Sequence, residues 1–139
     1  MSDEVVSEGL EYILETAFTE LQSVPANFYM GLCEDAAVAE DAVLADLTEL
    51  AVADGYAREL VASDDTDFTE AATGTNDRKV TTTTETFTAS GAWNGVEHVF
   101  LGTTIDDSGK LICAAALSVE RFLVNGDSLQ VNIIITLTG

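Results

Sequence analysis

The stretch IDDSGKLICAAALS, residues Ile105–Ser118, indicates how the chain folds. An aspartate-rich segment with one glycine, Gly109, leads directly into the apolar run LICAAAL. Alone, the stretch fits a metal-binding loop, a nucleophile loop or the turn of a hairpin. The extended residues on both sides favour the hairpin, because glycine supplies the positive φ that a tight turn needs. The alanines then predict a buried strand that another layer approaches closely.

Short strand-like segments, separated by similar turn residues, lie on both sides of this hairpin. Turn signals stand at Asn94–Gly95, Asp107–Gly109 and Asn125–Gly126, between segments rich in β-branched residues. Such spacing predicts a mainly β protein, an antiparallel sandwich or barrel, and we expect a β-sandwich of jelly-roll type over residues 25–139. The polar segment SDDTDFTEAATGTNDRK predicts a long exposed loop around residues 63–79.

The first 24 residues predict an amphipathic α-helix ahead of the sandwich. Apolar residues recur at helical spacing from Asp3 to Gln22, and the only proline, Pro25, ends the pattern. Such an apolar face packs either on the sheet or on another subunit. The candidate interface residues are Val6, Leu10, Leu14 and Phe18. With 139 residues, we expect the whole chain, 1–139, to form a single domain.

The charge balance is extreme, with 25 Asp and Glu against 5 Lys and Arg and a net charge of −20. Such a surface repels phosphate, so we expect no direct binding of nucleic acid. The acidity has two interpretations, which stay open: ordinary solubility, or adaptation to high salt, where counterions screen the carboxylates. No segment approaches the ~20 apolar residues of a membrane helix, and the acidic start is no signal peptide, so membrane association and export are not expected.

No group of residues predicts catalysis. His98 is the only histidine, and no nucleophile motif or glycine-rich phosphate loop is present. We therefore expect neither an enzyme nor a cofactor. Cys33 and Cys113 stand in apolar segments and are expected to be small buried residues. No metal site is predicted, because the weak calcium candidates lack the glycine and distal glutamate of an EF-hand; they are Asp64, Asp65, Asp67 and Glu70.

Three blocks of sequence carry a resemblance to a known group of proteins. The blocks are LADLTEL…DGYAREL, TFTASGAWNGVEHVFLGTT and DDSGKLICAAALS…FLVNGDSLQVNIIITL. Together they resemble the small virion structural proteins of tailed phages and tailed archaeal viruses, which are head decoration or tail-associated proteins. The resemblance runs from about Phe28 to Thr138. It implies structural roles for four residues: Tyr56 and Arg58, with the arginine anchoring a loop to a carboxylate, Trp93 in the core and Gly126 in the final hairpin.

The resemblance implies a structural component of a tailed-virus particle that acts by oligomeric packing. A capsid decoration or cement protein is favoured, ahead of another head- or tail-attached protein. The expected partners are other virion proteins and further copies of the chain, with a trimer favoured over a pentamer or hexamer. The contact between copies is expected at the helix or at edge strands, either the C-terminal VNIIITLT or Val80–Thr88. We expect the protein in the virion, after synthesis in the host cytoplasm. The alternative is a β-sandwich binding module for a surface glycan or Ca²⁺, although the aromatic content of 7% is low for a glycan reader.

Overall fold

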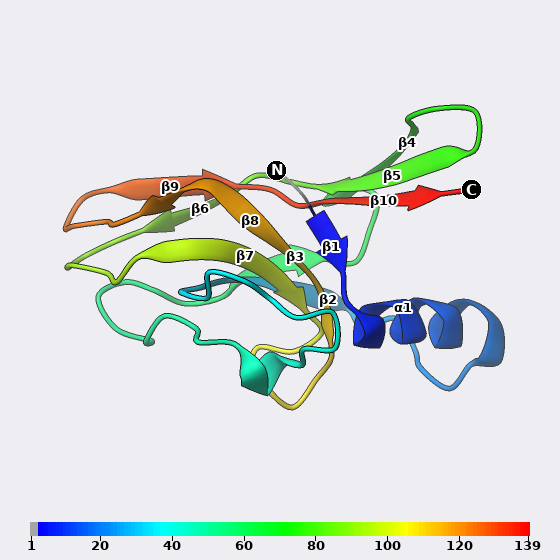
Figure 1. Cartoon of the computed structure of the whole chain (residues 1–139), viewed down its shortest axis with the longest axis horizontal. Coiled ribbons are helices and arrows are strands. Elements are labelled where there is room, and N and C mark those ends of the chain that lie inside the picture. The colour runs from blue at the N-terminus through cyan, green and yellow to red at the C-terminus, as the bar shows by residue number, and fades with distance from the viewer. Residues whose placement is uncertain (1–2) are drawn as a thin grey trace.

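The computed structural model describes residues 3–139 as a mainly β fold with antiparallel sheets and a short N-terminal helix (Figure 1). The first layer is a five-stranded sheet with the order β1 (Asp3–Val5), β8 (Leu111–Arg121), β7 (Val96–Gly102), β2 (Asn27–Cys33) and β3 (Glu59–Ala62). The second layer contains the three-stranded sheet β10 (Ile134–Thr138), β5 (Asp77–Thr82), β4 (Phe68–Ala72) and the pair β6 (Glu85–Thr88), β9 (Ser128–Val131). This sandwich-like arrangement confirms the predicted fold class.

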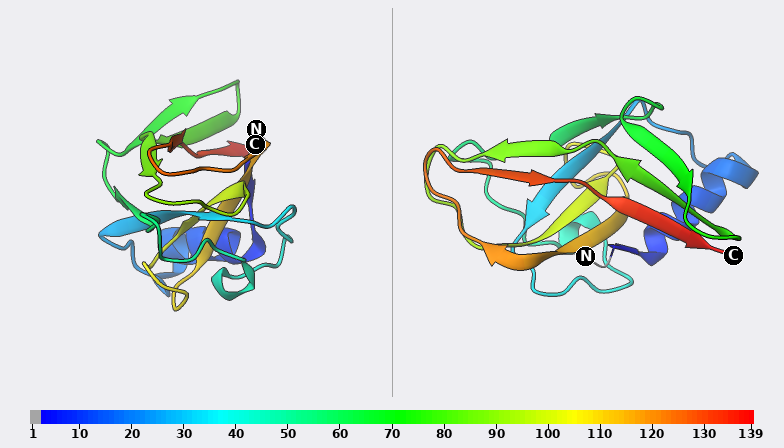
Figure 2. Two further views of the ribbon diagram at one scale, coloured as in Figure 1. Left: turned by 90° about the vertical axis from the view of Figure 1, so that its left-hand side faces the viewer. Right: turned by 90° about the horizontal axis from the view of Figure 1, so that it is seen from above.

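The two parts of the second layer lie end to end as one ribbon, visible from above in Figure 2. Strand β5 leads into β6, and β9 leads into β10, so the same two chain segments pair on both sides of a break. At the break the Thr82 N–H donates to the Ile133 carbonyl at 2.9 Å, and the Ile133 N–H donates to Thr82 Oγ1 at 2.9 Å. The threonine hydroxyl thus replaces a missing backbone acceptor and keeps the kinked ribbon hydrogen-bonded.

The core lies on both faces of the five-stranded sheet. On β7, Val99 and Leu101 point into the main core between the layers. Their neighbour Phe100 points to the other face, into a second cluster with Leu44 and Leu111. The segment after β2, which includes the 3₁₀ turn η2 (Leu44–Asp46), supplies part of this cluster. Burial on both faces explains why β7 and the first half of β8 are apolar runs rather than alternating strands.

The hairpin predicted from residues 105–118 is present, because β7 and β8 pair antiparallel with Gly102 opposite Leu111. The alanines of β8 have a specific neighbour. Phe100 lies opposite Ala114 on one side and opposite Gly31 of β2 on the other. A Cβ atom on Gly31 would lie 2.3 Å from the Phe100 ring, so the two small residues leave the space that this ring fills.

The predicted helix over residues 1–24 is wrong at its start. Residues Asp3–Val5 form strand β1, with Val5 opposite Cys113 of β8; Met1 and Ser2 lie outside the described residues. The α-helix α1 covers Ser7–Leu14 and continues as the π-helical turn η1 (Glu15–Thr19). The pairing with β8 decides the conformation of the first residues, and so β1 belongs to the sandwich. No helix of the described part of the chain is long and apolar enough to cross a membrane.

The predicted long loop around residues 63–79 is also wrong. Most of it forms the hairpin β4–β5, in which Glu70 stands opposite Val80. On its other side β5 pairs with β10, which places Ile135 opposite Val80. These pairings stabilise a segment whose own composition is polar.

Candidate functional site

One end of the sandwich differs from the rest of the molecule, and we call it the open end. It consists of α1, η1, the β4–β5 hairpin and the final strand β10 (Figure 1). The helix is fixed to β8 by close backbone approach. A Cβ atom on Gly9 would lie 2.0 Å from the Ile112 carbonyl oxygen, so only glycine allows this packing. The Tyr12 hydroxyl donates to the Ser23 carbonyl at 2.9 Å and attaches the chain that leaves the helix.

The helix turns most of its predicted apolar face towards solvent. Because Gly9 and Tyr12 face the body of the protein, the opposite side of the helix is exposed. We call the large apolar residues of this side, together with Leu21 just after η1, the helix stripe; their exposed fractions are 47% for Leu10, 57% for Leu14, 80% for Phe18 and 72% for Leu21. Of the four residues predicted at an oligomer interface, only Val6 is buried within the chain, at 2% exposure. A continuous apolar surface of this kind is typical of an interaction site.

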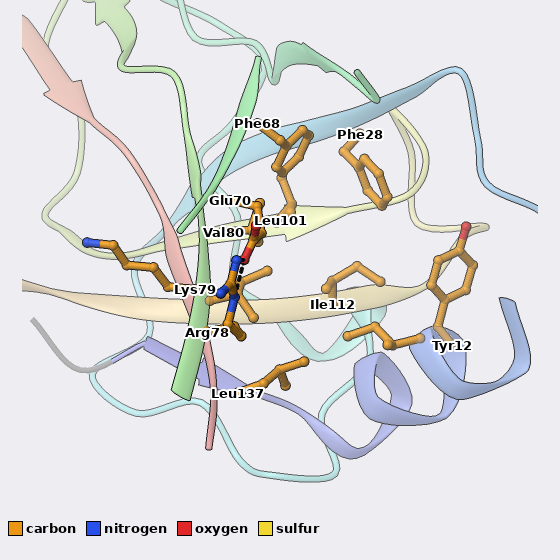
Figure 3. Close-up of a pocket in the computed structure, with 12 residues that line it drawn as sticks. Tyr12, Phe28, Phe68, Glu70, Arg78, Lys79, Val80, Leu101, Ile112 and Leu137 are labelled. Carbon is orange, nitrogen blue, oxygen red and sulfur yellow. Dashed lines mark hydrogen bonds and ion pairs between the residues drawn. The ribbon is translucent and has the colours of Figure 1, made fainter. Parts of the chain in front are cut away.

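Beside the helix lies an apolar cleft of about 330 Å³, shown in Figure 3. Tyr12 and Ile13 of α1 form one wall. The inward-facing side chains of the second layer form the other wall: Phe68, Val80, Ile135 and Leu137. Phe28, Leu101 and Ile112 of the first layer complete the lining. The second layer and the helix thus diverge at the open end, and the main core is reached from solvent through this cleft.

The charged residues of the cleft lining are Glu70, Arg78 and Lys79. Arg78 forms an ion pair with Glu70 across the β4–β5 hairpin, drawn in Figure 3. Both side chains are more than half exposed, so this pair contributes little to stability. The lining has more basic than acidic groups, which makes it unusual in a chain of net charge −20.

A second polar feature, the Arg58 cluster, joins two loops. The side chain of Arg58 is only 4% exposed, and all five of its N–H groups donate hydrogen bonds. Nε and Nη2 bond the two oxygens of Glu49 at 2.9 and 2.7 Å, and Nη2 also bonds Asp107 at 2.7 Å. Nη1 bonds the carbonyls of Thr104 and Asp106 at 3.0 and 2.7 Å. The structure therefore places Arg58 on a carboxylate, and this contact holds the β7–β8 loop against the segment before β3.

The guanidinium of Arg58 also lies over the Phe100 ring, 5.1 Å from its centre. Burial lowers the pKa of Arg58, but the hydrogen bonds to Glu49 and Asp107 outweigh burial and hold it above its ordinary value. The Tyr56 hydroxyl donates to the same Glu49 carboxylate at 2.5 Å and accepts from the Leu32 N–H at 3.0 Å. Burial, followed by the bond to Glu49, raises the pKa of Tyr56. The cluster is thus a fully hydrogen-bonded structural unit.

Trp93 and Gly126 take structural positions as well. The Trp93 ring meets Tyr56 edge to face at 5.8 Å, and its Nε1 donates to the Asp54 carbonyl at 2.8 Å. Gly126 has φ +93°, in the left-handed region, and stands in the turn between β8 and β9. Asp127 Oδ2 closes this turn by accepting from the Val124 N–H at 3.0 Å.

The carboxylates considered for calcium do not converge. Asp64 Oδ1 accepts from the N–H groups of Thr66 and Asp67, which lowers the pKa of Asp64, with the Thr66 hydroxyl as the largest cause. Asp67 accepts from the Ala62 N–H. Asp65 is exposed, and Glu70 pairs with Arg78 at the cleft. Within residues 3–139 as described, no group of three or more His, Cys, Asp or Glu side chains has the geometry of a metal site.

The histidine and the two cysteines are buried. His98 Nδ1 lies 2.7 Å from the Asp35 carbonyl. A carbonyl only accepts, so Nδ1 carries the proton. Cys33 and Cys113 are both buried and form no disulfide, as expected from their apolar segments. Burial raises the pKa of Cys33 to about 12, which removes its nucleophilic form at neutral pH.

Comparison with protein families decides the class. Residues 2–136 match the family described as Podophage GP4 fiber I protein gp80. The chain belongs to this family. Membership makes it a phage-type virion structural protein, as the sequence resemblance implied in its coarser form. The virion is therefore its location, and other virion components are its partners. No curated protein matches the chain.

The sequence alone did not reveal the cleft. Its walls come from six strands and one helix that are distant in sequence, and the β4–β5 hairpin was predicted as a loop. One signal was present in the sequence. Gly9, in the first turn of the amphipathic helix, weakens the helix unless another chain segment lies against it. Its position on the same side as Tyr12 marks the side of the helix that packs on β8.

Proposed function

We propose that the protein is a non-catalytic subunit of a virion-attached fibre and that it assembles as a homo-oligomer through the open end. The helix stripe is the observation that carries this proposal. Its four large side chains are 47–80% exposed. Exposing apolar area costs about 25 cal/mol per Å², so a stripe of this size favours a protein contact.

The family supports a fibre position over capsid decoration, which stays a prediction. An oligomer of identical subunits is the usual arrangement of a protein with one such surface, and closed cyclic symmetry is the usual result. A trimer remains the expected size. The net charge of −20 opposes contact between copies, so the apolar surfaces have to outweigh the repulsion.

The alternative, a module that binds a glycan or Ca²⁺, has less support. Glycan-binding sites present aromatic rings to solvent, and among the residues that the structure describes the large exposed hydrophobic ones include only two aromatic side chains, Phe18 and Phe122. A glycan array and calcium calorimetry test this alternative directly.

Cryo-microscopy of the virus particle tests the proposed function. We expect density for this sandwich in several copies around a symmetry axis of an appendage, with the open ends in mutual contact. Density on the capsid lattice, or the absence of the chain from purified particles by mass spectrometry, would contradict the fibre proposal.

A further inference from the structure

The open end carries two apolar features of opposite shape, a protruding helix stripe and a recessed cleft. We infer that the helix stripe of one copy inserts into the cleft of a second copy. This inference rests on the proposed homo-oligomer and specifies its contact surfaces. Leu14 and Phe18 of the first copy meet the walls formed by α1 and the second layer of the next copy.

The volume of the cleft fits the side chains of the helix stripe. A cavity of about 150 Å³ accepts one benzene ring. The cleft, at about 330 Å³, therefore has room for roughly two large side chains. Leu10, Leu14 and Phe18 of the stripe follow one another at four-residue spacing, so Leu14 and Phe18 lie about one turn apart. A pair of this kind is the usual anchor of a helix that binds in an apolar groove.

The charges beside the helix stripe and at the cleft are of opposite sign. Glu11 and Glu15 stand beside the stripe on the helix, and neither forms an ion pair among the residues that the structure describes. The pKa of Glu15 is raised, first by its hydrogen bond with Glu11, so these two carboxylates are crowded. Arg78 at the cleft contacts Glu70 through Nε and Nη2 and stays 59% exposed, so a carboxylate from another copy can reach it.

Stripe and cleft are different surfaces of the chain, so in the expected trimer their contact is heterologous. Such a contact joins copies head to tail and closes into a ring, or extends into a helix if the rotation does not close. In a two-fold dimer the same contact would instead occur twice, with the stripe of each copy in the cleft of the other. The competing arrangement is a symmetric dimer in which the stripes of the two copies contact each other. The difference between the two arrangements is measurable by cross-linking.

The first test mixes two variants that each carry one new cysteine. Leu14→Cys places a thiol on the stripe, and Leu137→Cys places one in the cleft wall, where the side chain is 52% exposed. The native Cys33 and Cys113 are buried and are not expected to form cross-links. The control replaces Leu137→Cys with Val124→Cys, which is 55% exposed in the turn between β8 and β9 at the other end of the molecule (Figure 1).

Under mild oxidation we expect a covalent dimer in the Leu14→Cys and Leu137→Cys mixture and in neither variant alone. The control mixture should give no dimer. A dimer from Leu14→Cys alone would show stripe-to-stripe contact and overturn the inference while leaving the homo-oligomer intact. No dimer in any mixture would overturn it too and leave the cleft to another virion protein.

The second test concerns the rim charge. Arg78→Gln and Arg121→Gln each remove one positive charge from an exposed side chain, but only Arg78 lies at the cleft. We expect Arg78→Gln to weaken association by about two- to five-fold at low salt and by less in molar salt. Arg121→Gln should match the wild type. Equal behaviour of the two variants would contradict the proposed pairing of Arg78 with the helix carboxylates.

Discussion

Replacing Arg58 tests whether the Arg58 cluster stabilises the fold. In Arg58→Met the side chain keeps an unbranched apolar stem but loses the guanidinium and its five hydrogen bonds, and Glu49 loses its only basic partner among the described residues. Removing one partner of a buried ion pair costs about 3–5 kcal/mol. Glu49 is 21% exposed and Asp107 is 56% exposed, which places this site at the lower end, about 3 kcal/mol. For a chain of this size the loss corresponds to a fall in Tm of about 10 °C.

The matched control is Arg78→Met, which removes the exposed pair with Glu70. Exposed pairs contribute about 1 kcal/mol or less, so this variant should melt within about 3 °C of the wild type. Arg58→Lys should fall between the two, because one ammonium cannot reach all of the acceptors. Differential scanning calorimetry in molar KCl provides the measurement. If Arg58→Met melted as close to the wild type as Arg78→Met does, the structural role of the cluster would be refuted.

Three further predictions concern solution behaviour. Thiol reagents should label Cys33 and Cys113 slowly in the native protein and fully after denaturation, and rapid native labelling of Cys113 would show that β8 is exposed. Because burial raises the folded-state pKa of Cys33 to about 12, the folded state holds this proton more tightly than the unfolded state. The urea midpoint should therefore fall as pH rises from about 9 towards 12, and less steeply in Cys33→Ala. With a net charge of −20, the Tm should rise with NaCl into the molar range, as the screening length falls from about 8 Å to about 3 Å. Sulfate at matched ionic strength separates screening from salting-out, and a Tm independent of NaCl would reject the halophilic interpretation.

The strands with their own sequence signal were predictable. The hairpin around Gly109 and the apolar strand β2 follow from turn residues and β-branched runs, which act locally. The segments whose predicted structure was wrong depend on pairing with strands that are distant in sequence. Strand β1 forms because β8, more than a hundred residues later, pairs with it, and β4 forms through the ladder from β5 to β10.

The side of the helix that packs against the sheet also could not be predicted from the spacing of apolar residues. Apolar spacing indicated a face that packs either on the sheet or on another subunit, whereas the residues of α1 that the structure buries within the chain are Gly9 and Tyr12. Small size at Gly9 decides this, because it lets the helix touch β8 more closely than any leucine could. Likewise the resemblance implied that Arg58 contacts a carboxylate, but among 25 acidic residues only the structure identifies Glu49 and Asp107.

The most direct test of the account is the mass of the protein in solution, measured by multi-angle light scattering at high protein concentration in molar KCl. The wild type should elute as a single oligomer, with a trimer expected. Phe18→Asp, which places a charge on a side chain 80% exposed in the monomer, should leave the fold intact and give the monomer mass of 14.7 kDa. A wild type that remains at 14.7 kDa under these conditions would contradict assembly through the open end.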